Sequence, residues 1–208
     1  MNRLTLKQKL WVPLLLCWVA LLIVTVVNAL EARSAQMDAR RSALADVTDM
    51  AASIVADYAK QADAGKLSVD DAKQQAIARV TAQRYGKSGY VTIVRSDSVM
   101  VAHPMSPQLN GKDMSGFRDA KGTALYHDIA AAGGSSAGSG YLRYWWPKPG
   151  ETKPSEKIGY VKRFAPWNWD FIAGAYMDDI QAQFYETLLR SGGMLLVLGV
   201  LVSFVASR

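Results

Sequence analysis

The chain has 208 residues, a formal net charge of +6 at pH 7 and one cysteine, Cys17. This length leaves room for one domain of ordinary size beside two apolar segments. A single cysteine cannot form an intrachain disulfide, so the domain must be held together by its own core. The lysines and arginines are dispersed along the chain, which argues against nucleic acid as a partner.

Two segments are apolar enough to cross a membrane. Residues 10–30 contain no charged side chain, and their number matches the hydrocarbon thickness of a bilayer. Residues 191–207 form a slightly shorter run between Arg190 and Arg208. A cleaved signal peptide is the alternative for the first run, but that run is longer than a usual signal core and a second one follows.

The charges beside these segments predict an orientation. Arg3, Lys7 and Lys9 precede the first segment and Arg208 follows the second, so both ends of the chain are expected in the cytoplasm. The intervening basic residues do not oppose this, because long loops translocate regardless of charge. The predicted order is a cytoplasmic N-terminus, a first transmembrane helix, an external domain and a second transmembrane helix, at residues 1–9, 10–30, 31–190 and 191–207.

The external domain is predicted to begin with two helices. Apolar residues recur at intervals of three and four beyond the first span, so one helix is expected from about residue 10 to 62, ending near Gly65. Ser68 is the expected N-cap of a second helix, with Asp70 and Asp71 in its first turn.

Strand signals follow the helices. β-branched and aromatic residues predict about five strands in hairpin-like order, with a short helix at 123–132 as the crossover between the second and third. A tight turn at Pro166 and Asn168 joins the last two strands, and Asp178 opens a further helix. The expected strands lie at 90–95, 99–102 and 141–146 and on either side of that last turn. The fold class is therefore α+β: a long N-terminal helix and an antiparallel sheet with helices on one face, flanked by two transmembrane helices.

Several residues of this sheet suit the binding of a small carboxylate. A lysine would balance the charge, tyrosine hydroxyls and a histidine would donate hydrogen bonds, and aromatic rings would cover the apolar end. The alternative is that the aromatic residues are core and that Lys162 extends outward to solvent. The candidates are Tyr144, Trp146, Tyr160, Lys162 and His103.

Enzymatic signals are weak. Residues 134–138 match the G-x-S-x-G pattern, but that motif requires a strand before it and a helix after it, whereas here the predicted order is reversed. A membrane-anchored hydrolase using Ser136 is thus a minor alternative. Two histidines and dispersed carboxylates offer no metal-ligand set, and there is no Gly-rich phosphate loop. We expect no metal, no cofactor and no catalytic residue.

Five motifs together carry a family resemblance. They are Arg84-Tyr85-Gly86 with Gly89-Tyr90, His103-Pro104, Leu109 to Asp113, Gly140 to Gly150, and Lys157 to Ile180. With these motifs the chain resembles the single Cache domain, type 2, over about residues 38–180. That domain is the extracellular sensor of bacterial methyl-accepting chemotaxis receptors and of some sensor kinases.

The resemblance implies a PAS-like sheet behind the long helix and a ligand such as acetate, propionate, pyruvate or lactate. It implies a non-enzymatic receptor that signals across the bacterial inner membrane in chemotaxis, with its sensor domain in the periplasm. The implied pocket residues are the five candidates above, with Arg84 and Tyr90 added. Asp170 departs from the family pattern, which usually has an aliphatic residue there.

Other functions stay open at this point. The chain could be the sensor region of a histidine kinase, or a stand-alone membrane-tethered Cache protein, because it stops before the HAMP linker and signalling bundle that such receptors carry. A structural protein without a ligand is a third class. A homodimer is expected because the long amphipathic helix has more apolar length than one small sheet can cover.

Overall fold

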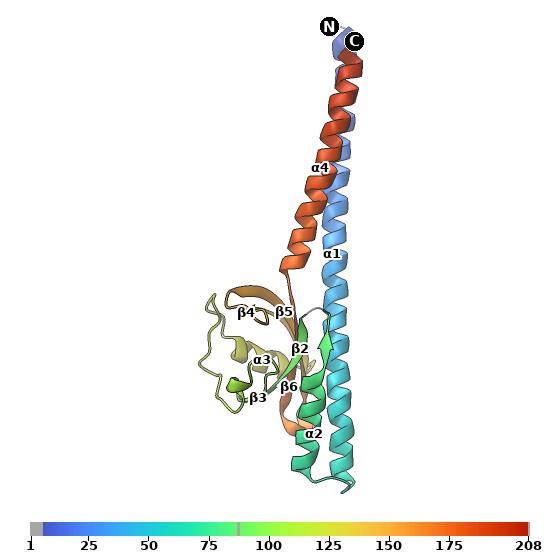
Figure 1. Cartoon of the computed structure of the whole chain (residues 1–208). Helices are drawn as coiled ribbons and strands as arrows, with labels where there is room; N and C mark the ends of the chain where they lie inside the picture. Colours follow the sequence, from blue (N-terminus) through green and yellow to red (C-terminus); the bar gives the residue numbers. More distant parts are fainter. Residues whose placement is uncertain (1–5, 87, 208) are drawn as a thin grey trace. The chain divides into compact units, whose positions relative to one another are not determined.

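The computed structural model describes residues 6–86 and 88–207 (Figure 1). Most of the predicted cytoplasmic N-terminus, residues 1–5, lies outside the described part, as does Arg208. The chain divides into two compact units: residues 39–178, and the two ends of the chain up to residue 38 and from residue 179. The candidate site lies wholly within the unit of residues 39–178.

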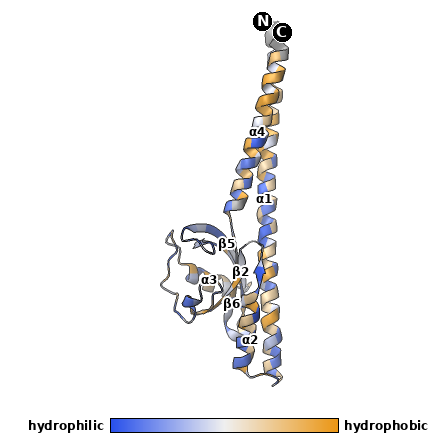
Figure 2. Ribbon diagram, viewed as in Figure 1, coloured by the Kyte–Doolittle hydropathy of each residue, from blue (hydrophilic) through white to orange (hydrophobic). Residues whose placement is uncertain are grey.

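Two long helices contain the apolar segments. Helix α1 (Leu6–Asp63) has 58 residues and confirms the predicted helix over 10–62, and α4 (Asp178–Ser207) has 30 residues. Each of these helices contains a segment that is long and apolar enough to cross a membrane, by length and composition. Figure 2 shows hydrophobic residues concentrated toward the N-terminal end of α1 and the C-terminal end of α4.

The sheet is antiparallel and has six strands in the order β1-β2-β6-β5-β4, with β3 pairing with β2. The five predicted strands are present, and β1 is an additional strand of two residues that was not predicted. The strands are β1 (Arg84–Tyr85), β2 (Gly89–Arg95), β3 (Met100–Ala102), β4 (Ser139–Pro147), β5 (Pro154–Phe164) and β6 (Trp169–Tyr176).

One face of the sheet packs against α1 and α2 (Val69–Ala82). Ser68 caps α2 as predicted, with its hydroxyl accepting a hydrogen bond from the backbone N–H of Asp71 at 3.0 Å. Val55 of α1 and Val80 of α2 are fully buried in one cluster with Phe171 of β6. This cluster anchors the C-terminal part of α1 to the sheet.

The opposite face is covered by α3 (Leu125–Gly133), so the prediction of helices on one face only is wrong. Leu125 and Ile129 of α3 are buried with Val161 of β5 and Ile172 of β6. The physical reason is that β6 is buried on both faces, and apolar residues on each face need cover. Two 3₁₀ turns complete the domain: η1 (Pro107–Leu109), and η2 (Ala165–Trp167), which forms the predicted turn between β5 and β6.

Asp170, the departure from the family pattern, is the anion of an ion pair on the α3 face. It is fully buried and lies opposite Arg163 in the register of β5 and β6. Arg163 donates from Nε to Oδ1 and from Nη2 to Oδ2, each at 2.8 Å, and Nη2 also donates to the carbonyl of Ala130 in α3 at 3.2 Å. This bidentate pair ties α3 to the sheet.

Candidate functional site

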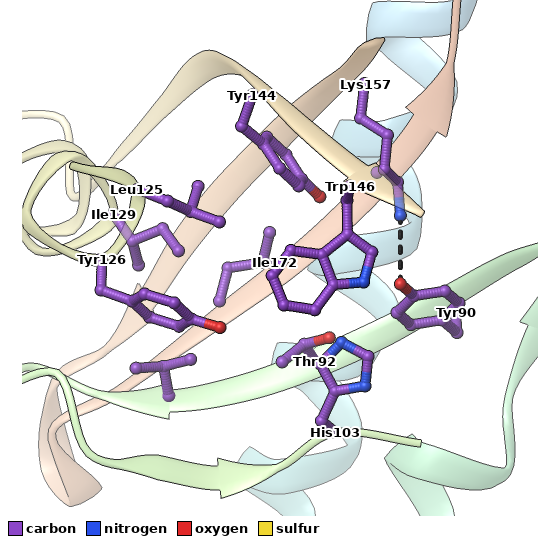
Figure 3. A pocket seen from close by; sticks show the side chains of 12 residues that line it. Tyr90, Thr92, His103, Leu125, Tyr126, Ile129, Tyr144, Trp146, Lys157 and Ile172 are labelled. Carbon is purple, nitrogen blue, oxygen red and sulfur yellow. Dashed lines mark hydrogen bonds between the residues drawn. The ribbon is translucent and has the colours of Figure 1, made fainter. Parts of the chain in front are cut away.

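A cavity lies between α3 and the sheet face that carries β2, β4, β5 and β6 (Figure 3). Its wall on the α3 side is largely apolar, with Leu125 and Ile129 beside Ile172 of β6. The other side is polar and aromatic. The polar and aromatic residues that line the cavity from the sheet side are Tyr90, Thr92, His103, Tyr144, Trp146 and Lys157, and Tyr126 of α3 adds a hydroxyl from the α3 side.

Strand register places Lys157 in this cavity. Tyr144 of β4 pairs directly with Lys157 of β5, and Lys157 pairs with Tyr176 of β6. Directly paired residues of neighbouring strands point to the same face of a sheet. Lys157 therefore shares the cavity face with Tyr144, and Trp146 lies two residues further along β4 on that face.

Lys157 is a buried cation without a carboxylate. Its residue is 1% exposed, and none of the ion pairs in the described part of the chain joins it to an acid. Its Nζ donates to the hydroxyl of Tyr90 at 3.3 Å and lies 4.4 Å and 4.6 Å from the ring centroids of Tyr90 and Tyr176. Burial lowers the pKa of Lys157 from 10.5 to about 7.

His103 is the second basic side chain that lines the cavity, and it is uncharged at neutral pH. Burial, with a further contribution from the charge of Lys157, lowers the pKa of His103 from 6.5 to about 4. Its Nδ1 accepts a hydrogen bond from the backbone N–H of Met105 at 3.3 Å, so the proton of the neutral ring resides on Nε2. The ring stacks on Trp146 with centroids 5.4 Å apart.

The tyrosine hydroxyls of the cavity are neutral donors. Burial raises the pKa of Tyr90 to about 12, and it raises the pKa of Tyr144 and of Tyr126 well above the usual value. All three side chains are therefore protonated over the whole physiological range. The cavity thus combines one titratable cation with several neutral hydrogen-bond donors, which is the chemistry that a single carboxylate requires.

Two glycines make room for these side chains. A Cβ at Gly174 of β6 would lie 2.6 Å from the Tyr144 hydroxyl and 3.0 Å from Cε of Lys157. A Cβ at Gly159 of β5 would lie 2.9 Å from Cε1 of Tyr144. The space open to the centres of water-sized molecules is about 20 Å³, and one water needs roughly 10–15 Å³ by that measure. The cavity therefore favours ligands of a few heavy atoms.

The structure brings four of the seven predicted site residues to the cavity. They are Tyr90, His103, Tyr144 and Trp146. The other three lie elsewhere, for reasons that the backbone makes plain.

Lys162 and Tyr160 lie on the opposite face of β5. Lys162 forms an ion pair with Asp49 of α1, and the Tyr160 ring lies 4.6 Å from that of Tyr141, whose hydroxyl donates to the carbonyl of Arg41 in α1. Lys162 and Tyr160 were predicted to line the ligand site, whereas the structure places both residues outside this cavity. The reason is parity: Lys162 is five positions from Lys157, so the two lysines point to opposite faces.

Arg84 also lies away from the cavity, in β1, just after the end of α2. Its guanidinium is exposed and donates to the carbonyls of Thr81 and Gln83 at 2.6 Å and 2.8 Å. Lys157 was not among the predicted site residues, although the β4–β5 hairpin offered a signal. A turn placed at Gly150, which has a φ of +81°, sets Tyr144 opposite Lys157 once both strands are extended from it.

The described residues show no machinery for hydrolysis around Ser136. This serine lies in an exposed turn that connects α3 to β4, a helix-to-strand connection unlike a nucleophile elbow. Of the two histidines, His103 lies in the cavity and His127 pairs with Asp128. Within the described residues, no group of three or more His, Cys, Asp or Glu could hold a metal ion.

A long helix behind an antiparallel sheet, with a small polar cavity on the far face, is the architecture of a ligand-binding sensor domain. The chain belongs to the Single Cache domain 2 family, whose model matches residues 36–190. The family resemblance read from the motifs is thereby confirmed, and a sensory role rather than catalysis follows for this domain.

Two characterised relatives are similar along much of the chain. Methyl-accepting chemotaxis protein McpP of Pseudomonas putida is 30% identical over 210 residues, which cover 99% of this chain and 38% of the relative. Sensor histidine kinase MctS of Rhizobium johnstonii is 32% identical over 120 residues, which cover 57% of this chain and 26% of the relative. The chain thus spans well under half the length of these relatives.

Solved structures of sensor domains have the same fold. One is described as a periplasmic sensor domain of a chemotaxis protein, with 34% identity and a TM-score of 0.66 over 68% of this chain and 97% of that one. Another is described as the structural basis for carboxylic acid recognition by a Cache chemosensory domain, with 33% identity and a TM-score of 0.66 over 69% of this chain and 97% of that one. The two candidate spans accordingly fit a protein of the inner membrane.

Proposed function

We propose that the cavity binds a small monocarboxylate such as acetate, propionate, pyruvate or lactate, and that the chain reports its presence across the inner membrane in chemotaxis. The observation that carries this proposal is Lys157, a buried ammonium group in a cavity without an acidic partner among the described residues. Burying an unpaired cation is costly, so a site that keeps one gains most from an anion that enters.

The arrangement assigns a role to each side chain. The ammonium of Lys157 faces the carboxylate, and the hydroxyls of Tyr90 and Tyr144 donate to its oxygens. His103 presents Nε2–H as a further neutral donor, and Trp146 covers the apolar end of the ligand. Carboxylic acid recognition by a Cache domain that is 33% identical to this chain supports the same ligand class here.

The membrane arrangement is part of the proposal. Residues 10–30 and 191–207 cross the inner membrane, residues 1–9 are cytoplasmic, and residues 31–190 form the periplasmic sensor domain, which works as a homodimer. Similarity to McpP over nearly the whole chain favours chemotaxis as the output. Similarity to MctS favours a second candidate, the sensor region of a histidine kinase, which would use the same cavity.

The test compares two lysines of the same strand. The full chain in detergent is titrated with acetate, propionate, pyruvate and lactate at pH 6.5 by calorimetry, as the parent, Lys157→Met and Lys162→Met. We expect Lys157→Met to lose at least tenfold in affinity, because a charge-assisted hydrogen bond is worth about 1.5–3 kcal/mol. Lys162→Met, the matched control, should bind as the parent does. Unchanged binding in Lys157→Met would refute the assignment.

A further inference from the structure

Tyr176, the last residue of β6, is shared by two lysines. Its residue is 6% exposed, and its ring centroid lies 4.6 Å from Nζ of Lys157 and 5.7 Å from Nζ of Lys148. Lys157 lines the cavity, whereas Lys148 lies just beyond the end of β4 with 28% of its side chain exposed. One buried ring therefore contacts an ammonium inside the binding site and another outside it.

Lys148 continues this connection to the start of α4. Its ammonium forms an ion pair with Asp178, the first residue of that helix. A carboxylate in the first turn of a helix interacts favourably with the helix dipole, so the environment of Asp178 affects the stability of that turn. The Lys148 side chain thus contacts both the aromatic neighbour of the binding site and the first residue of α4.

Tyr176 itself is held in place from several sides. Its hydroxyl donates to the carbonyl of Pro147 at 2.6 Å, and its own carbonyl accepts from Nη1 of Arg40 in α1 at 2.8 Å. The next backbone N–H, that of Met177, donates to the carbonyl of Glu156 at 3.0 Å. Because the ring is fixed, we expect a change of charge at Lys157 to be met by movement of the partly exposed Lys148 side chain rather than of the ring.

We propose that Lys148 couples the state of the cavity to the first turn of α4. This coupling deepens the proposed function and, for its biological use, rests on it. Two ammonium groups near one ring repel each other, so each weakens the attraction of the other to the ring. When an anion neutralises or withdraws Lys157, Lys148 is drawn closer to Tyr176 and its pair with Asp178 weakens. The start of α4 then opens more readily.

A double-mutant cycle tests the coupling without any ligand, because only such a cycle separates a specific interaction from two independent effects. The full chain in detergent is compared as the parent, Lys157→Met, Lys148→Met and the double variant. Hydrogen exchange of residues 177–184 reports opening of the first turn of α4. Lys153→Met is the matched control, since Lys153 is an exposed lysine of the same loop.

We expect Lys157→Met to accelerate this exchange about threefold in the parent background and by less than about 1.5-fold in the Lys148→Met background. A threefold effect is the size expected for a partly exposed cation–π contact and ion pair. Lys153→Met should leave the effect of Lys157→Met at its parental size. Equal effects of Lys157→Met in both backgrounds, or none in either, would overturn the proposal. If Lys157→Met folds poorly, raising the pH from 6 to 9 in the parent and in Lys148→Met removes the same charge, and the exchange of residues 177–184, divided by the intrinsic base-catalysed rate at each pH, gives the same comparison.

Propionate as the probe separates this inference from the proposed function. Propionate should protect residues 89–95 of β2 in the parent and in Lys148→Met, and should accelerate exchange at residues 177–184 in the parent alone. Absence of protection at β2 would count against carboxylate binding, while the variant cycle would still decide the coupling. Protection at β2 with equal acceleration at α4 in both proteins would refute the coupling and leave the binding site standing.

Discussion

Binding of a carboxylate should depend on pH through Lys157. Burial lowers the pKa of this lysine to about 7, and a bound carboxylate would raise it again by supplying the missing counter-charge. Only the protonated form attracts the anion, so the apparent affinity scales with the protonated fraction of the free protein. That fraction falls from about nine tenths at pH 6 to about one hundredth at pH 9 for a group with a pKa near 7.

No other group near Lys157 among the described residues obscures this titration. Tyr90 of β2 has its pKa raised to about 12 by burial, and burial also raises the pKa values of Tyr144 of β4 and Tyr176 of β6. His103, which follows β3, has its pKa lowered to about 4 by burial, so it is neutral throughout the range. A small carboxylic acid is ionised above pH 6 as well, with a pKa of roughly 4.

The expected result is therefore a loss of about 100-fold in affinity from pH 6 to pH 9, or tenfold per unit above pH 7. Calorimetry with propionate at four pH values measures it, and repeating the titration at pH 8 in buffers of different ionisation enthalpy should reveal uptake of nearly one proton per ligand. Lys162→Met should show the same slope. An affinity that stays within threefold from pH 6 to pH 9 would refute the role given to Lys157.

Three further predictions concern stability and the shape of the cavity. Lys157→Met should stabilise the apo protein at pH 6 by on the order of 2–5 kcal/mol, because the pKa of Lys157 is lower in the folded than in the unfolded protein. The free-energy cost of burying the charged lysine is present below about pH 7 and vanishes above about pH 10.5. Urea unfolding at pH 6 measures the change in stability, and a destabilised variant would contradict the prediction. Gly174→Ala should reduce propionate affinity at least tenfold with little loss of fold, because its Cβ would displace Tyr144 and Lys157; binding at the parental level would show that this wall is not rigid. Asp170→Ala should cost about 3 kcal/mol in urea unfolding by leaving Arg163 unpaired, and a cost below about 1 kcal/mol would show that the pair does not tie α3 to the sheet.

Much of the fold could be predicted because its signals are local. The apolar period of α1, the Ser68 cap of α2 and the turn at Asn168, which adopts a left-handed φ of 52°, each depend on a few neighbouring residues. The cover provided by α3 was not predictable in the same way. It depends on contacts between α3 and strands far away in the sequence, and the strands that hint at it are β2 and β6, which are buried on both faces.

The site shows where strand periodicity stops being sufficient. Tyr144 and Trp146 lie on the face of β4 that lines the cavity, but β5 carries a lysine on each of its faces. Alternation alone does not say which lysine joins Tyr144. The hairpin register decides it, and burial explains the result: Lys162 reaches Asp49 at the α1 side, whereas Lys157 has aromatic rings as its neighbours.

The central claim is that Lys157 receives the carboxylate of the ligand, and a crystal structure of the protein with propionate tests it most directly. We predict a carboxylate with an oxygen about 2.8 Å from Nζ of Lys157 and the other oxygen near the hydroxyl of Tyr90 or Tyr144. The ethyl group should point toward Trp146. A carboxylate bound at Lys162, or a cavity that stays without propionate at saturating concentration, would contradict the account.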